Sequence, residues 1–295
     1  MLALLLPAAA VVLAWWGSTA LLLHLDMRAQ RSFPLSFGLA SLLAVAAGVG
    51  IEHSSVQADV PGAYLAFACA LALWGWLELG FLLGYLTGPG KRSCDPTWQG
   101  WQRFGHAFNA LRDHEISLLG GALLVVALCW NAPNQVAVWT YLVLWAMRAS
   151  AKLNVFLGVR NLSEDFLPPH LRYLASYFRQ APMNRLFPFT VTLAVVVDVL
   201  LFEQAVASAD DAFGSTALML VATLLLLAIV EHWCLVVPVN LSALWQWQLQ
   251  PGHDEPPEET AAATAAIAPG PRLKLIQPAA AEQASPDPGS RRSGR

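Results

Sequence analysis

Seven apolar runs, each close to the length needed to cross a lipid bilayer, are the feature that most constrains this chain. A membrane-spanning helix needs about 20 predominantly apolar residues, because it rises about 1.5 Å per residue through a hydrocarbon core about 30 Å thick. The runs cover Leu2–Leu23, Ser36–Ile51, Pro61–Leu86, Trp101–Trp130, Val136–Arg160, Phe187–Glu203 and Gly214–Pro238. We therefore predict an all-α fold, a polytopic transmembrane helix bundle with about seven spans.

The composition agrees with a membrane protein and argues against a nucleic-acid partner. Hydrophobic residues make up 56% of the chain and charged residues only 13%, whereas a soluble domain usually has about 25% charged residues. The chain also contains 12 tryptophans, and indole rings favour the interface between lipid and water. With a formal net charge of −3, the chain has no overall basic field to attract nucleic acid. The lipid bilayer is the partner that the composition predicts.

The first apolar run is predicted to be a retained helix rather than a cleaved signal peptide. No basic segment precedes it, and Trp15 and Trp16 stand where a cleavage site needs small residues.

The distribution of basic residues between the loops predicts the orientation in the membrane. Short loops rich in Lys and Arg face the cytoplasm. The loops after the second, fourth and sixth runs contain no Lys or Arg. Basic residues near the other loops are Arg28, Arg31, Lys91, Arg92, Arg103, Arg160, Arg172, Arg179 and Arg185. With an odd number of spans, this alternation places the N-terminus in the periplasm and the C-terminus in the cytoplasm.

Two segments outside the apolar runs have their own predicted structure. Residues 1–248 form the transmembrane bundle, and residues 249–295 form a Pro/Ala-rich cytoplasmic tail that is too polar to pack and is predicted to be disordered. In the loop after the fifth run, Leu171, Leu174 and Phe178 share one helical face. This pattern favours a short amphipathic helix at the membrane interface, and a solvated connector is the alternative.

Ionisable residues inside four of the runs gather at one depth and are the candidate functional residues. Charges within a membrane span are costly, so they mark functional positions by default. Counted from the predicted cytoplasmic ends, they lie about 10 to 20 Å inside the membrane. The residues of this layer are Glu78, His114, Glu115, Arg148, Lys152, Glu231 and His232.

Three interpretations of this layer remain open at the level of sequence. In the first, the glutamates neutralise Arg148 and Lys152, and Asn154 completes the hydrogen bonds, because an unpaired charge at this depth is costly. Arg148, Lys152, Asn154 and Arg160 are accordingly candidates for ion pairing or anion binding.

The second interpretation is a metal site. The doublets His114-Glu115 and Glu231-His232, together with Glu78, supply the ligand types used for iron, manganese or zinc. Adjacent helical residues point about 100° apart, so each doublet would normally provide one ligand.

In the third, His106, His114 or His232 ligates the magnesium of a chlorophyll or the iron of a haem. The chain contains no phosphate-binding loop, no nucleophile elbow and no zinc-protease motif. A non-enzymatic role is therefore favoured over an enzymatic one.

Several sequence blocks resemble one known family. The blocks are Trp74-Gly75-Trp76-Leu77-Glu78, Thr87-Gly88-Pro89, Phe104-Gly105-His106, His114-Glu115, Ala132–Asn161, Phe166-Leu167-Pro168, Leu171-Arg172-Tyr173, Pro182-Met183-Asn184 and Glu231-His232-Trp233. On these blocks, the chain closely resembles the PuhE family of photosynthetic complex assembly proteins of anoxygenic phototrophic bacteria. The resemblance spans about residues 2 to 248, and the segment Arg148–Asn161 is its most specific part.

The resemblance implies a multi-pass protein of the bacterial inner membrane, encoded in the gene context of the reaction-centre H subunit. Its implied role is the accumulation of the reaction centre and core light-harvesting complex, through contacts with their subunits and possible handling of bacteriochlorophyll. It implies no catalytic residues. The alternative is a membrane metalloenzyme that acts on a bacteriochlorophyll precursor, with Arg148 and Lys152 pairing with carboxylates of the substrate.

Overall fold

A computed structural model describes residues 2–162, 164 and 167–238, and these residues are mainly helical. The elements are α1 (Leu2–Asp26), the 3-10 helix η1 (Gln30–Ser32), α2 (Phe33–Ser55), α3 (Val60–Leu82), α4 (Gly100–Leu128), α5 (Val136–Leu157), the 3-10 helix η3 (Pro169–Tyr177), α6 (Leu186–Ala207) and α7 (Ala212–Val236). Within the described part of the chain there is no strand, only one isolated parallel bridge between Val159 and Gln180. The all-α prediction is confirmed there, and the predicted tail, 249–295, lies outside the described residues.

Five of the seven long helices are long and apolar enough to cross a membrane, judged by length and composition. They correspond to the segments Leu4–Asp26, Gln30–Ser55, Val60–Leu82, Leu186–Ala207 and Ala212–Val236. Helices α4 and α5 are not apolar enough by the same measure, because both carry some of the ionisable residues that the sequence predicts at one depth. The prediction of about seven spans therefore holds for five helices and stays a prediction for α4 and α5.

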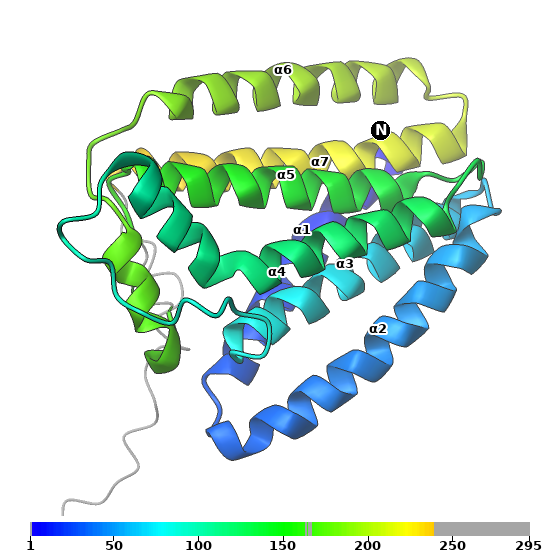
Figure 1. The fold of residues 1–295 in the computed structure, drawn as a ribbon. Coiled ribbons are helices and arrows are strands. Elements are labelled where there is room, and N and C mark those ends of the chain that lie inside the picture. Colours follow the sequence, from blue (N-terminus) through cyan, green and yellow to red (C-terminus); the bar gives the residue numbers. More distant parts are fainter. Residues whose placement is uncertain (1, 163, 165–166, 239–295) are drawn as a thin grey trace, which may run out of the picture. The chain divides into compact units, whose positions relative to one another are not determined.

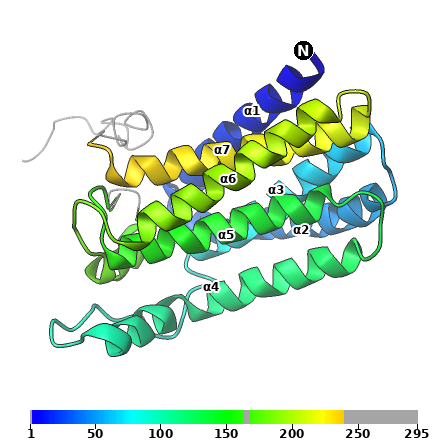
Figure 2. The ribbon, with the colours of Figure 1, turned by 90° about the horizontal axis from the view of Figure 1, so that it is seen from above.

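Helix α3 lies at the centre of the bundle and contacts α1, α2, α4, α5 and α7. Its buried face contains the small residues Ala63, Ala66 and Ala70, which allow neighbouring helices to approach closely. Helix α2 packs along α3, and α6 packs along α7 (Figure 1; Figure 2). Both outer helices expose large apolar side chains, such as Leu42 on α2 and Leu193 on α6. This is the distribution expected when lipid covers the outside of a bundle.

The turn before α5 is held by one buried asparagine. The Asn134 side-chain amide donates to Ser54 O at 3.0 Å and to Gln57 O at 3.1 Å, both at the end of α2. Its side-chain oxygen accepts from Val136 N, the first residue of α5, at 3.0 Å. Asn134 thus satisfies backbone groups at two helix ends that have no partner within their own helices.

At the other end of the bundle, the connections 83–99 and 158–185 pack on one another and form what we call the capped end. In η3, Leu171, Leu174 and Tyr177 are buried in a cluster with Phe81 of α3 and Ala110 of α4. A ring N–H of His170 donates to Leu82 O, near the end of α3, at 2.9 Å. The predicted amphipathic helix is therefore a 3-10 helix whose apolar face is covered by protein. Because a 3-10 helix has three residues per turn, this face continues with Tyr177, and the predicted Phe178 is instead the half-buried residue after η3.

Arg103, near the start of α4, joins three parts of the capped end. Its guanidinium donates to Phe156 O at 3.3 Å and to Tyr177 O at 2.5 Å. It also lies over the Phe156 ring, 4.2 Å from the centroid. In the sequence, Arg103 is only one of the basic residues whose distribution predicts the orientation in the membrane. In the structure, its contacts hold the start of α4 against the end of α5 and against η3.

Asn184 makes the corresponding connection between α5 and α6. Its side-chain amide donates to Asn154 Oδ1 at 2.9 Å, to Asn154 O at 3.1 Å and to Gly158 O at 3.0 Å. Its side-chain oxygen accepts from Leu186 N at 2.8 Å and from Phe187 N at 3.1 Å. One side chain therefore binds the end of α5 and caps the start of α6.

We expect Asn184→Ala to lower the free energy of unfolding by about 1 to 2 kcal/mol, because the variant loses a helix cap and leaves carbonyl groups without donors. Unfolding of the detergent-purified protein, followed by circular dichroism, measures this change. Gln102→Ala is the matched control, since Gln102 is exposed on α4. Equal stability of the two variants would contradict the connecting role of Asn184.

Candidate functional site

The charged layer lies near the capped end of the bundle. Glu78 stands four residues before the last residue of α3, Leu82, and Arg148 stands nine residues before the last residue of α5, Leu157. At about 1.5 Å per residue, these positions lie about 6 and 14 Å from the helix ends. Measured from the helix ends, Arg148 falls within the predicted 10 to 20 Å, whereas Glu78 is shallower, because α3 ends at Leu82 and the predicted apolar run continues to Leu86.

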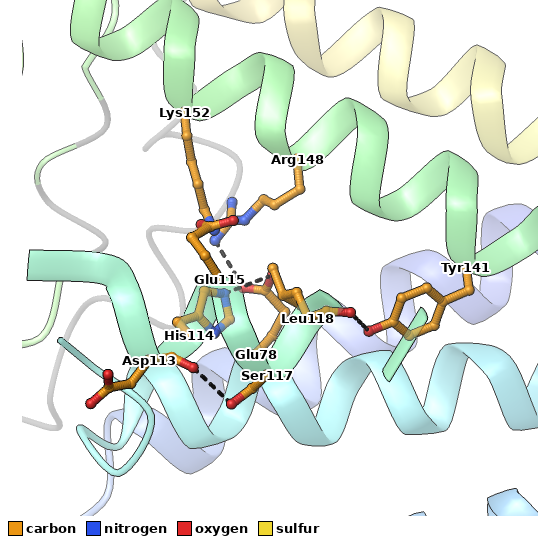
Figure 3. A network of polar contacts seen from close by, with 9 residues as sticks. All are labelled: Glu78, Asp113, His114, Glu115, Ser117, Leu118, Tyr141, Arg148 and Lys152. Atoms are coloured by element: carbon orange, nitrogen blue, oxygen red, sulfur yellow. Dashed lines mark hydrogen bonds and ion pairs between the residues drawn. The ribbon is translucent and has the colours of Figure 1, made fainter. Parts of the chain in front are cut away.

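The first ion pair of the layer joins α3 to α5. Arg148 Nη2 lies 2.9 Å from Glu78 Oε2. Figure 3 draws both side chains within the network of polar contacts. The Glu78 side chain is 8% exposed, whereas the Arg148 side chain is 42% exposed. A charge enclosed to the extent of Glu78 needs a close partner, and Arg148 supplies it.

The second ion pair joins α5 to α4. Lys152 Nζ lies 2.6 Å from Glu115 Oε1, and both side chains are about 20% exposed. Arg148 and Lys152 are four residues apart on α5, so they share one helical face. This face therefore meets a carboxylate from α3 and another from α4.

His114 is enclosed between these pairs. The residue has no exposed surface, and its ring lies 4.6 Å from the Phe81 ring, centroid to centroid. His114 Nε2 is 3.7 Å from Glu78 Oε1, and neither ring nitrogen nor Glu78 Oε1 has a hydrogen-bond partner. Buried polar atoms are usually hydrogen-bonded, so this corner of the layer combines a structural ion pair with unsatisfied polar groups.

Tyr141 closes the layer towards the bundle interior. Its hydroxyl donates to Leu118 O of α4 at 2.8 Å, and its ring meets the Trp74 ring of α3 edge to face, with centroids 5.3 Å apart. A Cβ atom at Gly121 would collide with the Tyr141 hydroxyl. Sequence reasoning missed Tyr141, because an aromatic residue in an apolar run carries no signal that distinguishes it.

His232 belongs to a different polar chain, between α7 and α5. Its Nδ1 lies 2.8 Å from Ala228 O and must carry the proton, because a carbonyl only accepts. Its Nε2 then accepts from the Ser150 hydroxyl at 2.9 Å. Ser150 also accepts from Asn154, which is buried and bound to Asn184 rather than to a charged group. Both nitrogens of His232 are therefore engaged, and the partner Ser150 was missed by the sequence analysis.

The remaining candidates lie at the surface of the bundle. Glu231 is exposed on α7, which packs against α1. It makes no ion-pair contact with Arg148, whose partner is Glu78. His106 is exposed near the start of α4 and stacks on Trp98, with ring centroids 3.6 Å apart. Arg160 is exposed beyond the end of α5.

The donor set does not converge on a metal position. Among the described residues, no group of three or more His, Cys, Asp or Glu side chains could hold a metal ion. Glu78 and Glu115 each face a cationic side chain instead. The geometry of this layer corresponds to the ion-pair interpretation, and the metal interpretation has no cluster here on which to rest.

Together, the apolar helices and the paired charges define a helical membrane protein with an ion-pair layer inside the bundle. The chain belongs to the family described as "Protein of unknown function (DUF3623)", whose model matches residues 1–256. It is 36% identical over 265 residues to the "Uncharacterized 30.4 kDa protein in puhA 5'region" of Rhodobacter capsulatus. That match covers 87% of this chain and 94% of the relative. No solved structure matches the chain.

The ion pair between Glu78 and Arg148 generates a stability prediction. We expect Glu78→Ala to lower the free energy of unfolding by about 3 kcal/mol, the lower end for breaking a buried pair, because Arg148 is partly exposed. Adding Arg148→Ala should recover at least about 1 kcal/mol, since no unpaired charge then remains. Chemical unfolding in detergent measures both changes.

Asp113→Ala is the control for this pair, because Asp113 pairs with Arg112 where both side chains are nearly half exposed. Its effect should stay within about 1 kcal/mol. Additive losses in the double variant would refute direct coupling of Glu78 with Arg148.

Proposed function

We propose that this protein is an integral membrane assembly factor of the PuhE type, acting in the accumulation of the photosynthetic reaction centre and core light-harvesting complex. The observation that carries this proposal is the similarity over almost the whole chain to the Rhodobacter capsulatus protein of the puhA 5' region. The resemblance described above connects this gene region with the reaction-centre H subunit. The proposed location is the bacterial inner membrane, with the capped end in the cytoplasm.

The structure of the charged layer supports an assembly role more than catalysis. The two cationic side chains of α5 are each bound to a carboxylate from another helix. These contacts fix α3, α4 and α5 against one another. A bundle fixed in this way offers a stable surface on which subunits of a larger complex can be held.

The capped end supports the proposed contact with subunits of the complex. Arg160, Arg172, Arg179 and Arg185 are all exposed there. The apolar face of η3 is buried beneath this surface, so the exposed arginines are held on a packed base. A surface of this charge suits acidic segments of a partner subunit.

One histidine fits the proposed handling of bacteriochlorophyll better than the other two candidates. A magnesium ligand needs a free ring nitrogen and space for the macrocycle. His114 has no exposed surface, and His232 uses both of its ring nitrogens. His106 is exposed, and its stack on Trp98 fixes the plane of the imidazole. The proposal therefore assigns pigment contact to His106.

The assembly role is tested by complementation. In Rhodobacter capsulatus lacking the puhA 5'-region relative, we expect reduced near-infrared absorption of the reaction centre and core antenna in isolated membranes, and we expect this chain to restore it. The Glu78→Ala variant should not restore it, because the bundle loses the contact between α3 and α5. The Asp113→Ala variant should restore it fully. Unchanged absorption in the deletion strain would contradict the proposal.

The pigment contact is tested separately. We expect the protein purified in mild detergent from phototrophic cells to carry bacteriochlorophyll, and His106→Ala to reduce the bound pigment at least fivefold, measured by absorption per protein. His53→Ala is the control, because His53 is also exposed, and its ring is hydrogen-bonded to Gln57 near the end of α2. Equal pigment in both variants would remove His106 from the proposal.

A further inference from the structure

The accessible charges of the layer point to a ligand that the ion pairs do not explain. Arg148 has 42% of its side chain exposed and bonds to Glu78 through Nη2 only. A guanidinium carries five N–H donors, and inside a membrane protein such donors need acceptors. Glu231 is also exposed and has no ion-pair contact with a described residue.

These two charges stand on facing parts of α5 and α7 but make no ion-pair contact with each other. His232, which follows Glu231, lies 2.9 Å from the hydroxyl of Ser150, two residues after Arg148, and the ion pair of Arg148 is with Glu78. The helices that carry them pack on one another. A group that fits both charges must therefore present a negative oxygen to Arg148 and a positive donor to Glu231.

The relative depth of the two charges gives the direction of this group. His232 of α7 lies 2.9 Å from the Ser150 hydroxyl of α5, so this contact gives the relative level of the two helices. Arg148 stands two residues before Ser150, and Glu231 stands one residue before His232. Counted from this contact, Arg148 is the deeper of the two positions along the helices.

This order matches the head group of a zwitterionic phospholipid, in which the phosphate lies next to the apolar chains and the ammonium lies nearer to water. Leu227 and Ala228 of α7 stand four and three residues before Glu231, so they share its helical face on the membrane side, and both are half-buried. They offer an apolar surface along which an acyl chain can run.

We propose that Arg148 and Glu231 form a binding site for a zwitterionic phospholipid, with the phosphate on Arg148 and the ammonium on Glu231. The bound lipid satisfies the donors of Arg148 that Glu78 leaves free. It also completes the charge balance of Glu231 without disturbing the ion pair between Glu78 and Arg148. This lipid site goes beyond the proposed function. It does not depend on that function, because the purified protein binds the lipid without any subunit of the photosynthetic complex.

The test measures lipid binding to the purified full-length protein by native mass spectrometry. We expect phosphatidylethanolamine to bind at least tenfold more tightly than phosphatidylglycerol, which lacks the amine. Glu231→Gln should remove this preference, because glutamine has nearly the shape of glutamate but carries no charge. Glu203→Gln, which changes an exposed glutamate on α6, should keep it. Glu231→Gln breaks no ion-pair contact, so its folding is expected to be retained.

Three outcomes would overturn the proposal. Equal binding of the two lipids would indicate a site for anionic phosphate alone or an unspecific lipid contact. An unchanged preference in Glu231→Gln would exclude the ammonium position. Equally tight binding of glycerophosphoethanolamine, which has no acyl chains, would assign the site to a soluble phosphate ester. The complementation experiment has a separate readout, so failure of either proposal is recognised independently.

Discussion

The pairing of charge within the bundle is the constraint on which the arrangement of α3, α4 and α5 depends. Arg148 and Lys152 lie on one face of α5, and each requires a carboxylate from another helix. A shift of α5 along its axis by one turn, about 5.4 Å, would separate both pairs at once. The two contacts therefore fix the register of three helices more strictly than apolar packing does, since apolar side chains tolerate small displacements.

The capped end protects this register. Arg103 binds the end of α5 and η3 together, while Asn184 binds the end of α5 to the start of α6. Asn134 performs the same task at the opposite end, between α2 and α5. Each of these side chains satisfies backbone groups at helix termini, which have no partners within the helices themselves. Helix α5 is consequently held at both ends as well as at its charged layer.

Residues that look alike in the sequence differ in their contacts in the structure. His114 and His232 each stand beside a glutamate in a long helix, yet His114 has unsatisfied nitrogens and His232 has none. Glu78 and Glu231 are both glutamates of spanning helices, yet only Glu78 is enclosed and paired. The different surroundings are the reason why a structural role and a binding role are assigned to members of the same layer.

The sequence by itself determined the helical membrane bundle, the positions of its long helices and the charged residues of the layer. It could do so because apolar length and intramembrane charge are local properties of a segment. Only the tertiary structure decided the partners: Glu78 with Arg148, Ser150 with His232, and Asn184 with the ends of two helices. It also showed that η3 is covered by protein. These outcomes depend on the rotation and level of one helix relative to another, and no single segment carries that information.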